Sequence, residues 1–151
     1  SSATALLATF FGNREFNSNL NGWDVSSVTT LFQTFYESGF NQDLNGWDLS
    51  SVTALSNTYA NAFDFNQELN GWDTSSVTTL EAVFQRAPFN THLNGWDISS
   101  VTTLAFTFNN AIDFNQDLDG WDLTSVINLF VTFRSAYVFN GEISGWDVSA
   151  S

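Results

Sequence analysis

One unit of 24 or 25 residues recurs along this chain, and its clearest marker is a Gly-Trp-Asp triplet. All six tryptophans lie in such triplets, at Trp23, Trp47, Trp72, Trp96, Trp121 and Trp146. A fixed period of this length is typical of a solenoid, because each unit is too small to bury its own apolar face and becomes stable only by stacking on its neighbours. We therefore expect residues 1–151 to form a single repeat domain.

Apolar residues keep fixed distances from each tryptophan. Phe16 precedes Trp23 by seven residues, and Val28, Leu31 and Phe35 follow it. The spacing of Val28, Leu31 and Phe35 is i, i+3 and i+7, which places them on one face of a helix. Only the step after the Phe35-type aromatic varies in length between units, which predicts a surface loop there.

The two halves of the unit predict different local structures. Residues 24–27 offer N-cap side chains to the expected helical turn, whereas residues 20–25 are typical of a turn that leads into a short strand. The expected fold class is thus an α/β solenoid of six coils, each with a short strand or turn and a short helical turn. A glycine directly before every tryptophan predicts a positive φ or a close approach by a neighbouring coil.

Two stretches carry a family resemblance. Residues 40–53 read FNQDLNGWDLSSVT and residues 114–122 read FNQDLDGWD. Both resemble the FNQDLSGWDVSNVTNM repeats of the DUF285 surface-protein family, which is related to the BspA-like leucine-rich repeats, and the resemblance covers nearly the whole chain. It implies a leucine-rich-repeat-like solenoid of extracellular surface proteins, linked to adhesion or interaction and not to catalysis. One departure is that this chain has no methionine, and the position before the aromatic holds Thr34, Thr58, Val83, Thr107 and Thr132.

Composition excludes several partners. Three Lys+Arg against 16 Asp+Glu give a formal charge of −13, with no lysine. Such a surface repels nucleic acid and anionic lipid, and no apolar run approaches the roughly 20 residues that span a bilayer. We expect neither a nucleic-acid partner nor membrane insertion, and an extracellular or cell-surface location. The absence of cysteine excludes disulfides and thiolate metal sites.

The chain begins and ends in mid-unit. Leu6 and Phe10 fit the second half of a unit, whereas residues 145–149 supply the first half of another. Terminal coils normally carry polar caps, yet both ends are apolar here. We expect uncapped ends that dock head to tail onto identical subunits or adjacent repeats, through Leu6, Leu7, Phe10, Phe11, Trp146 and Val148.

Two polar positions recur in every unit, and we interpret both as structural. The asparagine after each Phe16-type residue predicts a ladder that satisfies backbone groups between coils. The aspartate of each triplet predicts capping or an Asx turn. A second acidic row leaves calcium as the weaker alternative, because other residues interrupt it and no EF-hand spacing occurs; it contains Asp43, Glu68, Asp117 and Glu142. No cofactor is predicted.

Three classes of function remain. No nucleophile or carboxylate is placed to act with His92, the single histidine, so we do not expect an enzyme. The leading hypothesis is a structural or adhesive repeat protein that assembles end to end into a filament or continues a longer array. The alternative is a surface-displayed module that binds a protein or a glycan through the variable loops 36–39, 61–64, 85–88, 109–113 and 134–138. Ice binding is the third class, since Thr29, Thr53, Thr78 and Thr102 align, although the expected helical turn disfavours a flat array.

Overall fold

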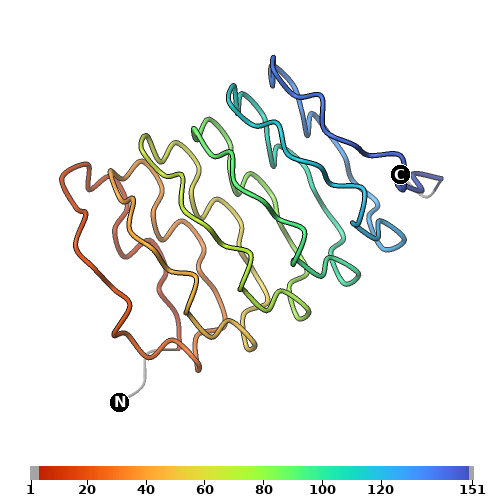
Figure 1. Ribbon diagram of the computed structural model, residues 1–151. Helices are drawn as coiled ribbons and strands as arrows, with labels where there is room; N and C mark the ends of the chain where they lie inside the picture. The colour runs from red at the N-terminus through yellow and green to blue at the C-terminus, as the bar shows by residue number, and fades with distance from the viewer. Residues whose placement is uncertain (1–3, 150–151) are drawn as a thin grey trace.

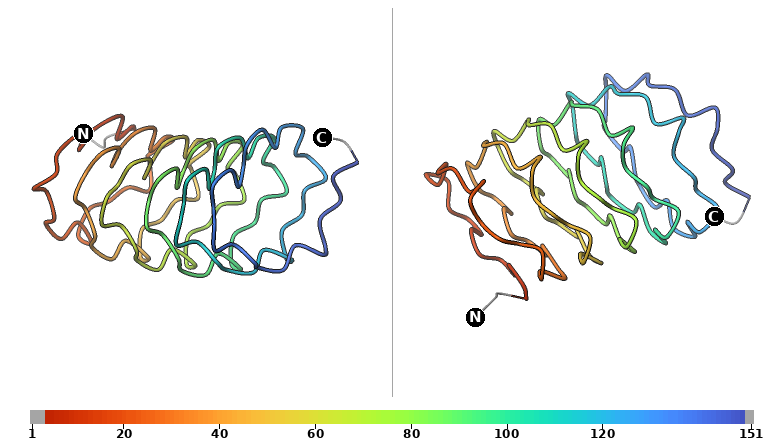
Figure 2. Two further views of the ribbon diagram at one scale, coloured as in Figure 1. Left: turned by 90° about the horizontal axis from the view of Figure 1, so that it is seen from above. Right: turned by 60° about the horizontal axis from the view of Figure 1, so that its bottom comes forward.

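The computed structural model describes residues 4–149, which form coils that follow one another along a single axis. Figure 1 shows the coils side by side from the N-terminal to the C-terminal end, and the two turned views of Figure 2 agree. Isolated parallel bridges connect equivalent residues of successive coils, in the order Thr30, Ala54, Thr79, Thr103 and Asn128. The repeat in the sequence is therefore a repeat in space.

Residues 4–149 contain no helix and no continuous strand, and the isolated bridges are their only β pairing. The predicted α/β solenoid with leucine-rich-repeat-like elements is therefore wrong. Residues 20–25, expected to lead into a strand, begin with a β-turn in which the Trp23 N–H donates to the Leu20 carbonyl (2.9 Å). A second turn follows, in which the Val28 N–H donates to the Val25 carbonyl (2.8 Å).

Residues 31–38, which overlap the helical turn expected over residues 28–35, form a ribbon of overlapping β-turns. Three N–H groups close these turns at 3.0 to 3.2 Å, from Thr34 to the Leu31 carbonyl, from Tyr36 to Gln33 and from Ser38 to Phe35. Gln33 and Glu37 have φ of 55° and 54°, the positive value that the third residue of a type II turn requires. A right-handed helix excludes such angles, so the segment cannot be helical.

The same two positions carry a positive φ in every coil. The pairs are Ala8 and Gly12, Gln33 and Glu37, Asn57 and Asn61, Ala82 and Arg86, Phe106 and Asn110, and Val131 and Ser135. Only one of these residues is glycine and three are asparagine, which tolerates this region; each of the others costs about 1–2 kcal/mol there. Bonding and packing between coils must therefore offset a cost that recurs along the ribbon.

The helical prediction failed because the turn ribbon buries the same spacing of residues. The prediction rested on Val28, Leu31 and Phe35 at i, i+3 and i+7, and all three are buried, as they would be on the inner face of a helix. Apolar spacing alone therefore does not distinguish the two structures.

The glycines before the tryptophans also differ in part from expectation. None of them has a positive φ. A Cβ at Gly71, Gly95 or Gly145 would meet the preceding coil, whereas Gly22, Gly46 and Gly120 have open space around them. Close approach therefore explains half of these glycines.

Phenylalanines and a tyrosine fill the core as two parallel ladders. Along the Phe16-type ladder, ring centroids of successive coils lie 5.8 to 6.4 Å apart. Along the Phe35-type ladder they lie 5.3 to 6.0 Å apart. Within a coil the two rings stack at 3.7 to 4.3 Å. Such pairs add about 0.5–1.5 kcal/mol each beyond their burial.

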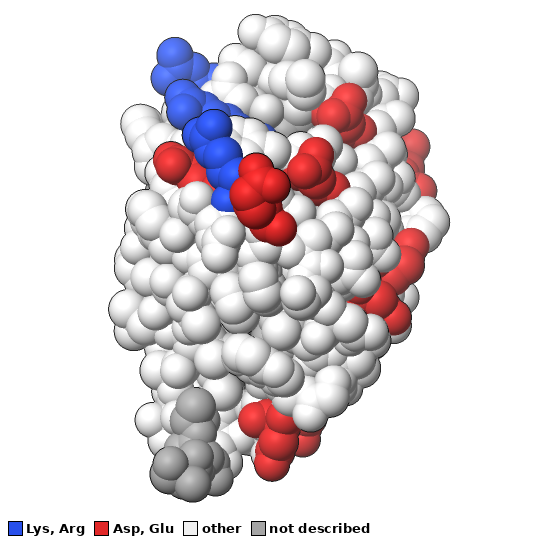
Figure 3. All heavy atoms as spheres, turned by 90° about the vertical axis from the view of Figure 1, so that its left-hand side faces the viewer, with Lys and Arg blue, Asp and Glu red and all other residues white. Residues whose placement is uncertain are grey.

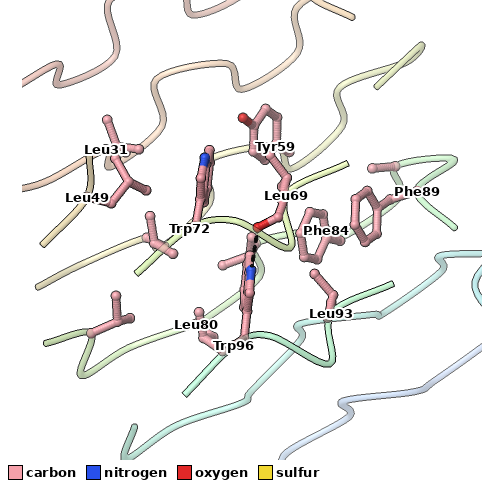
Figure 4. Packing of buried hydrophobic residues seen from close by; sticks show 14 of the residues in the cluster. Leu31, Leu49, Tyr59, Leu69, Trp72, Leu80, Phe84, Phe89, Leu93 and Trp96 are labelled. Carbon is pink, nitrogen blue, oxygen red and sulfur yellow. Dashed lines mark hydrogen bonds between the residues drawn. The ribbon is translucent and has the colours of Figure 1, made fainter. Parts of the chain in front are cut away.

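The tryptophans form a third ladder, of which Figure 4 shows Trp72 and Trp96 from close by. Each indole N–H after the first coil donates to a carbonyl of the preceding coil at 2.8 to 3.3 Å, from Trp47 to Leu20, Trp72 to Leu44, Trp96 to Leu69, Trp121 to Leu93 and Trp146 to Leu118. The Trp72 and Trp96 rings stack with centroids 6.2 Å apart. Trp47, Trp72, Trp96 and Trp121 are therefore buried in register inside the stack.

The position before each Phe35-type aromatic holds a buried threonine in four coils. The Thr58 hydroxyl lies 2.7 Å from the Leu55 carbonyl of its own coil and 3.0 Å from the Leu31 carbonyl of the preceding one. Thr34, Thr107 and Thr132 repeat this arrangement. Threonine is therefore a polar core residue whose hydroxyl is satisfied by both coils that it joins.

Tyr59 supplies a first prediction. Its ring fills a Phe35-type position, but its hydroxyl is the buried side-chain oxygen that lacks a hydrogen-bond partner within residues 4–149. Because an unsatisfied buried hydroxyl costs about 1–3 kcal/mol, we expect Tyr59→Phe to raise the free energy of unfolding by about 1 kcal/mol in urea titrations. Phe84→Tyr is the matched reverse change and should lower it.

Alkaline pH tests the same hydroxyl. Burial raises the pKa of Tyr59 well above its ordinary value. The unfolded chain, but not the folded one, therefore releases this proton above about pH 10, so that stability is intact below this pH and falls as the pH rises past it. Tyr59→Phe should make this alkaline loss smaller, and an equal loss in both proteins would contradict the burial argument.

Val131 supplies a second prediction. A β-branched side chain stands there at φ 50°, whereas the equivalent residue three coils earlier is Asn57 at φ 58°. Since asparagine tolerates this region and valine does not, Val131→Asn should raise the melting temperature, by an amount equivalent to about 1 kcal/mol. The reciprocal Asn57→Val should lower it, and a loss of stability in both variants would contradict the assignment of strain.

Candidate functional site

Backbone hydrogen bonds along the turn ribbon run in one direction from coil to coil. Four alternate N–H groups of one coil donate to the next coil at 2.9 to 3.2 Å, from Leu31 to the Ala54 carbonyl, Gln33 to Ser56, Phe35 to Thr58 and Glu37 to Ala60. The later coils repeat the pattern. Along the ribbon, each coil therefore directs these donors toward the C-terminal end of the stack and the acceptors toward the N-terminal end. Backbone bonds of the threonine row beside the ribbon run the other way, as from the Thr53 N–H to the Thr29 carbonyl (2.9 Å).

The two end faces of the stack consequently carry opposite sets of backbone groups. On the C-terminal face the N–H groups of Leu129, Val131, Phe133 and Ser135 occupy the donor positions, and on the N-terminal face the carbonyls of Ala5, Leu7, Thr9 and Phe11 occupy the acceptor positions. None of these eight groups has a partner among residues 4–149. The ribbon edges of the two faces are thus complementary to each other, and neither edge is complementary to itself.

Core side chains are uncovered on both faces. Trp23 is 44% exposed, whereas its counterparts Trp47, Trp72, Trp96 and Trp121 are 2 to 4% exposed. At the other end Val148 is 48% exposed, although Leu49 and Leu123 at the same position are at most 2% exposed. A further coil on either face would bury these side chains as the interior coils do.

The N-terminal face is also poor in charge. Figure 3 looks onto this end of the stack, where most of the face is uncharged. Basic side chains form one row that runs inward from the upper left edge, and acidic side chains lie beside the lower end of that row and toward the right and lower margins. An uncharged centre with a charged rim is the usual anatomy of a protein interface.

The predicted interface residues divide into several environments. Leu6 is already buried in the core, Phe10 and Trp146 are half-buried on the end faces, and Leu7, Phe11 and Val148 are exposed. Sequence reasoning missed Trp23, Ile143 and all the backbone groups. Trp23 could have been found from the repeat itself, because the first tryptophan has no preceding coil to cover it.

The triplet aspartates all form Asx turns. Asp73 Oδ1 accepts the Ser75 N–H (3.1 Å) and the Ser75 hydroxyl (2.6 Å), and the other five aspartates accept the N–H two residues on in the same way. These hydrogen bonds hold the pKa of Asp73 below its ordinary value, although Asp48 and Asp97 in the adjacent coils act in the opposite direction. The predicted capping or Asx-turn role is confirmed.

The asparagine ladder is present as predicted. Each Oδ1 accepts the backbone N–H of the equivalent asparagine in the next coil, at 2.6 to 3.0 Å, from Asn17 through Asn41, Asn66, Asn90 and Asn115 to Asn140. The Oδ1 atoms of these side chains are therefore already bonded to backbone N–H groups.

The second acidic row does not converge on one point. Asp43 Oδ1 accepts the Asn45 N–H, and Asp117 Oδ1 accepts the Glu142 N–H; Glu68 and Glu142 are exposed. Residues 4–149 hold no group of three or more histidine, cysteine or acidic side chains that could bind a metal ion. The same part of the chain contains no cavity and no helix of the length and apolarity that a membrane span requires.

The exposed threonine row lies beside the parallel bridges and not on a helical surface. The hydroxyls of Thr29, Thr53, Thr78 and Thr102 each donate to a carbonyl of the preceding coil at 3.1 to 3.3 Å. The geometric reason for disfavouring ice binding is therefore wrong, and ice binding itself stays untested.

One family model matches the chain. It is described as "Mycoplasma protein of unknown function, DUF285" and matches residues 1–88 and 54–151, which together span the whole sequence. The chain belongs to the DUF285 family. No curated protein and no solved structure matches it. The related leucine-rich-repeat resemblance is not confirmed.

The Asx turns of this DUF285 chain generate a third prediction. Ser75→Ala removes the hydroxyl that lowers the pKa of Asp73, so the pKa of that carboxyl should rise toward its ordinary value in an NMR titration. Ser76→Ala is the control, because no bond joins its exposed hydroxyl to Asp73. Since a lowered carboxyl pKa supports the folded state above about pH 4 and this support is lost as the pH falls through the folded pKa, the acid loss of stability should be smaller in Ser75→Ala.

Proposed function

We propose that this DUF285 chain is a non-catalytic structural repeat protein whose two end faces dock head to tail on further copies of the chain. The observation that carries the proposal is the polarity of the turn ribbon at the two end faces, where four donors at one end and four acceptors at the other have no partner among residues 4–149. The same contacts would equally join coils within a longer array.

The interior coils supply the geometry of the proposed contact. Docked in that register, the N–H groups of residues 129, 131, 133 and 135 would meet the carbonyls of residues 5, 7, 9 and 11 of the next copy. Trp23 of that copy would donate its indole N–H to the Ile143 carbonyl, as Trp47 donates to Leu20. The exposed surfaces of Trp23 and Val148 would become core.

Such a contact is heterologous, since different surfaces of the two copies meet. Heterologous contacts form rings when the rotation closes and open filaments when it does not. Each added copy presents the same free face again, so assembly would extend the rod and would not stop at a dimer.

Charge works against this assembly. Copies with a formal charge of −13 repel each other, and added salt screens that repulsion. The apolar and backbone contacts at the faces do not depend on net charge. Association should therefore strengthen with ionic strength. The acidic surface also supports our proposal of an extracellular location and a structural or adhesive role.

A fourth prediction tests the polarity of docking. We expect sedimentation velocity of the wild-type chain to reveal oligomers that grow with concentration and salt. Trp23→Glu blocks the N-terminal face and Val148→Glu blocks the C-terminal face, and each should weaken self-association at least about 100-fold, because docking would bury an unpaired carboxylate.

Mixing the two variants gives the decisive result. Each variant keeps one intact face, so head-to-tail docking predicts a one-to-one dimer that does not grow further, and formation of this dimer also proves that both variants fold. Phe63→Glu is the control, because Phe63 is exposed to a similar degree but lies in a loop between coils; it should assemble like the wild type. A monomeric wild type at high concentration and salt, or dimers of either variant alone, would refute the proposal.

A further inference from the structure

The turns before four of the six tryptophans contain a reactive dipeptide. Four coils have Asn-Gly at this place, in the pairs Asn21-Gly22, Asn45-Gly46, Asn70-Gly71 and Asn94-Gly95. In such a pair the glycine backbone nitrogen can attack the Cγ atom of the asparagine side chain, because no Cβ on the glycine hinders the approach. The four turns have the same sequence, so their different hydrogen bonds provide an internal comparison.

Neighbouring coils occupy these groups unequally. The Gly71 N–H donates to Asn45 Oδ1 (2.7 Å), and the Gly95 N–H donates to Asn70 Oδ1 (2.6 Å). At Asn70-Gly71 both the attacking nitrogen and the side-chain amide are therefore engaged. At Asn45-Gly46 only the amide is engaged, and at Asn94-Gly95 only the nitrogen is.

Asn21-Gly22 differs from the other three pairs. Within residues 4–149 neither the Asn21 side-chain amide nor the Gly22 N–H has a hydrogen-bond partner. Both residues are exposed, and a Cβ at Gly22 would meet nothing within 4 Å. The turn there has room for ring closure, and no hydrogen bond needs to break first.

We infer that Asn21 is a site of spontaneous deamidation in the folded protein. The Gly22 nitrogen loses its proton and forms a bond to Cγ, the bond from Cγ to the side-chain nitrogen breaks, and ammonia leaves with that proton. Water then opens the resulting succinimide at either carbonyl. The net change consumes one water and releases one ammonia, and it leaves aspartate or isoaspartate at position 21.

The modification weakens the join between the first two coils. Isoaspartate adds a carbon to the main chain inside the turn from Leu20 to Trp23. The Leu20 carbonyl at the start of this turn accepts both the Trp23 N–H (2.9 Å) and the Trp47 indole N–H (3.2 Å). Isoaspartate at position 21 therefore disturbs the acceptor that connects the first coil to the second.

A fifth Asn-Gly pair lies outside these turns. Asn140 and Gly141 belong to the segment of the asparagine ladder, where the Asn140 N–H is held by Asn115 (2.6 Å) and Gly141 packs against the Gln116 backbone. Ring closure there requires this packed segment to move. The deamidation rate at Asn140 is therefore a reference with which the rate at Asn21 can be compared.

The fifth prediction is a ranking of reaction rates. Purified chain is incubated at mildly alkaline pH, and deamidation at each site is followed by peptide mapping with mass spectrometry. In folded protein Asn21 should react at least about tenfold faster than Asn70, because each hydrogen bond that must be broken contributes about 1 kcal/mol. In urea the four turn sites should react at similar rates.

Two variants test whether the hydrogen bonds cause the differences in reaction rate. Asn45→Ala frees the Gly71 nitrogen and should accelerate deamidation at Asn70 about fivefold, while circular dichroism confirms that the stack is folded. Asn21→Gln should abolish the product at position 21 without changing the other sites, and hydrogen exchange of residues 20–28 should then stay constant during incubation. Equal rates at Asn21 and Asn70 in the folded wild type, or a faster reaction at Asn140 than at Asn21, would overturn the inference.

Discussion

The structure depends on the alternation of two hydrogen-bonding roles among the backbone N–H groups of the turn ribbon. Alternate N–H groups close turns within a coil, while those between them donate to the next coil. This arrangement satisfies the ribbon without helix or sheet, and it requires two residues with positive φ in each coil. The regular spacing of the aromatic ladders follows from it, because the bonds between coils hold equivalent residues at one register.

Side chains supply the stabilisation that the strained backbone needs. The buried threonines and the indole N–H groups bind carbonyls of the preceding coil, and the asparagine ladder binds amides of the following one. Most recurring polar side chains thus have the same structural role, which is to connect adjacent coils by hydrogen bonds. This explains why the repeat is conserved within the chain at polar as well as apolar positions, and why Tyr59, whose hydroxyl joins nothing, stands out.

Position in the repeat could be predicted from the sequence, but backbone conformation could not. The register of Trp72 and Trp96, the Asn66 bond to Asn41 and the Asx turn of Asp73 all follow from fixed spacing and side-chain chemistry. The ribbon was mistaken for a helix because both bury residues at i, i+3 and i+7, as at Val28, Leu31 and Phe35. Glycine at the ribbon positions would have indicated their positive φ. Only Gly12 is glycine, and residues such as Val131 give no sign of that backbone conformation in the sequence. The candidate site was found in part, because apolar ends are visible in a sequence, whereas the polarity of backbone bonds is not.

That polarity determines which assemblies are possible. Two copies that met through their N-terminal faces would bring the carbonyls of residues 5, 7, 9 and 11 against the same carbonyls, and two C-terminal faces would bring donors against donors. Both arrangements would leave buried backbone groups unsatisfied, at a cost of about 1–3 kcal/mol for each group. A symmetric dimer is therefore disfavoured by the same hydrogen bonds that make the interior coils stable. Head-to-tail contact is the arrangement that continues the interior pattern, so the direction of bonding inside one chain carries over to any rod built from several.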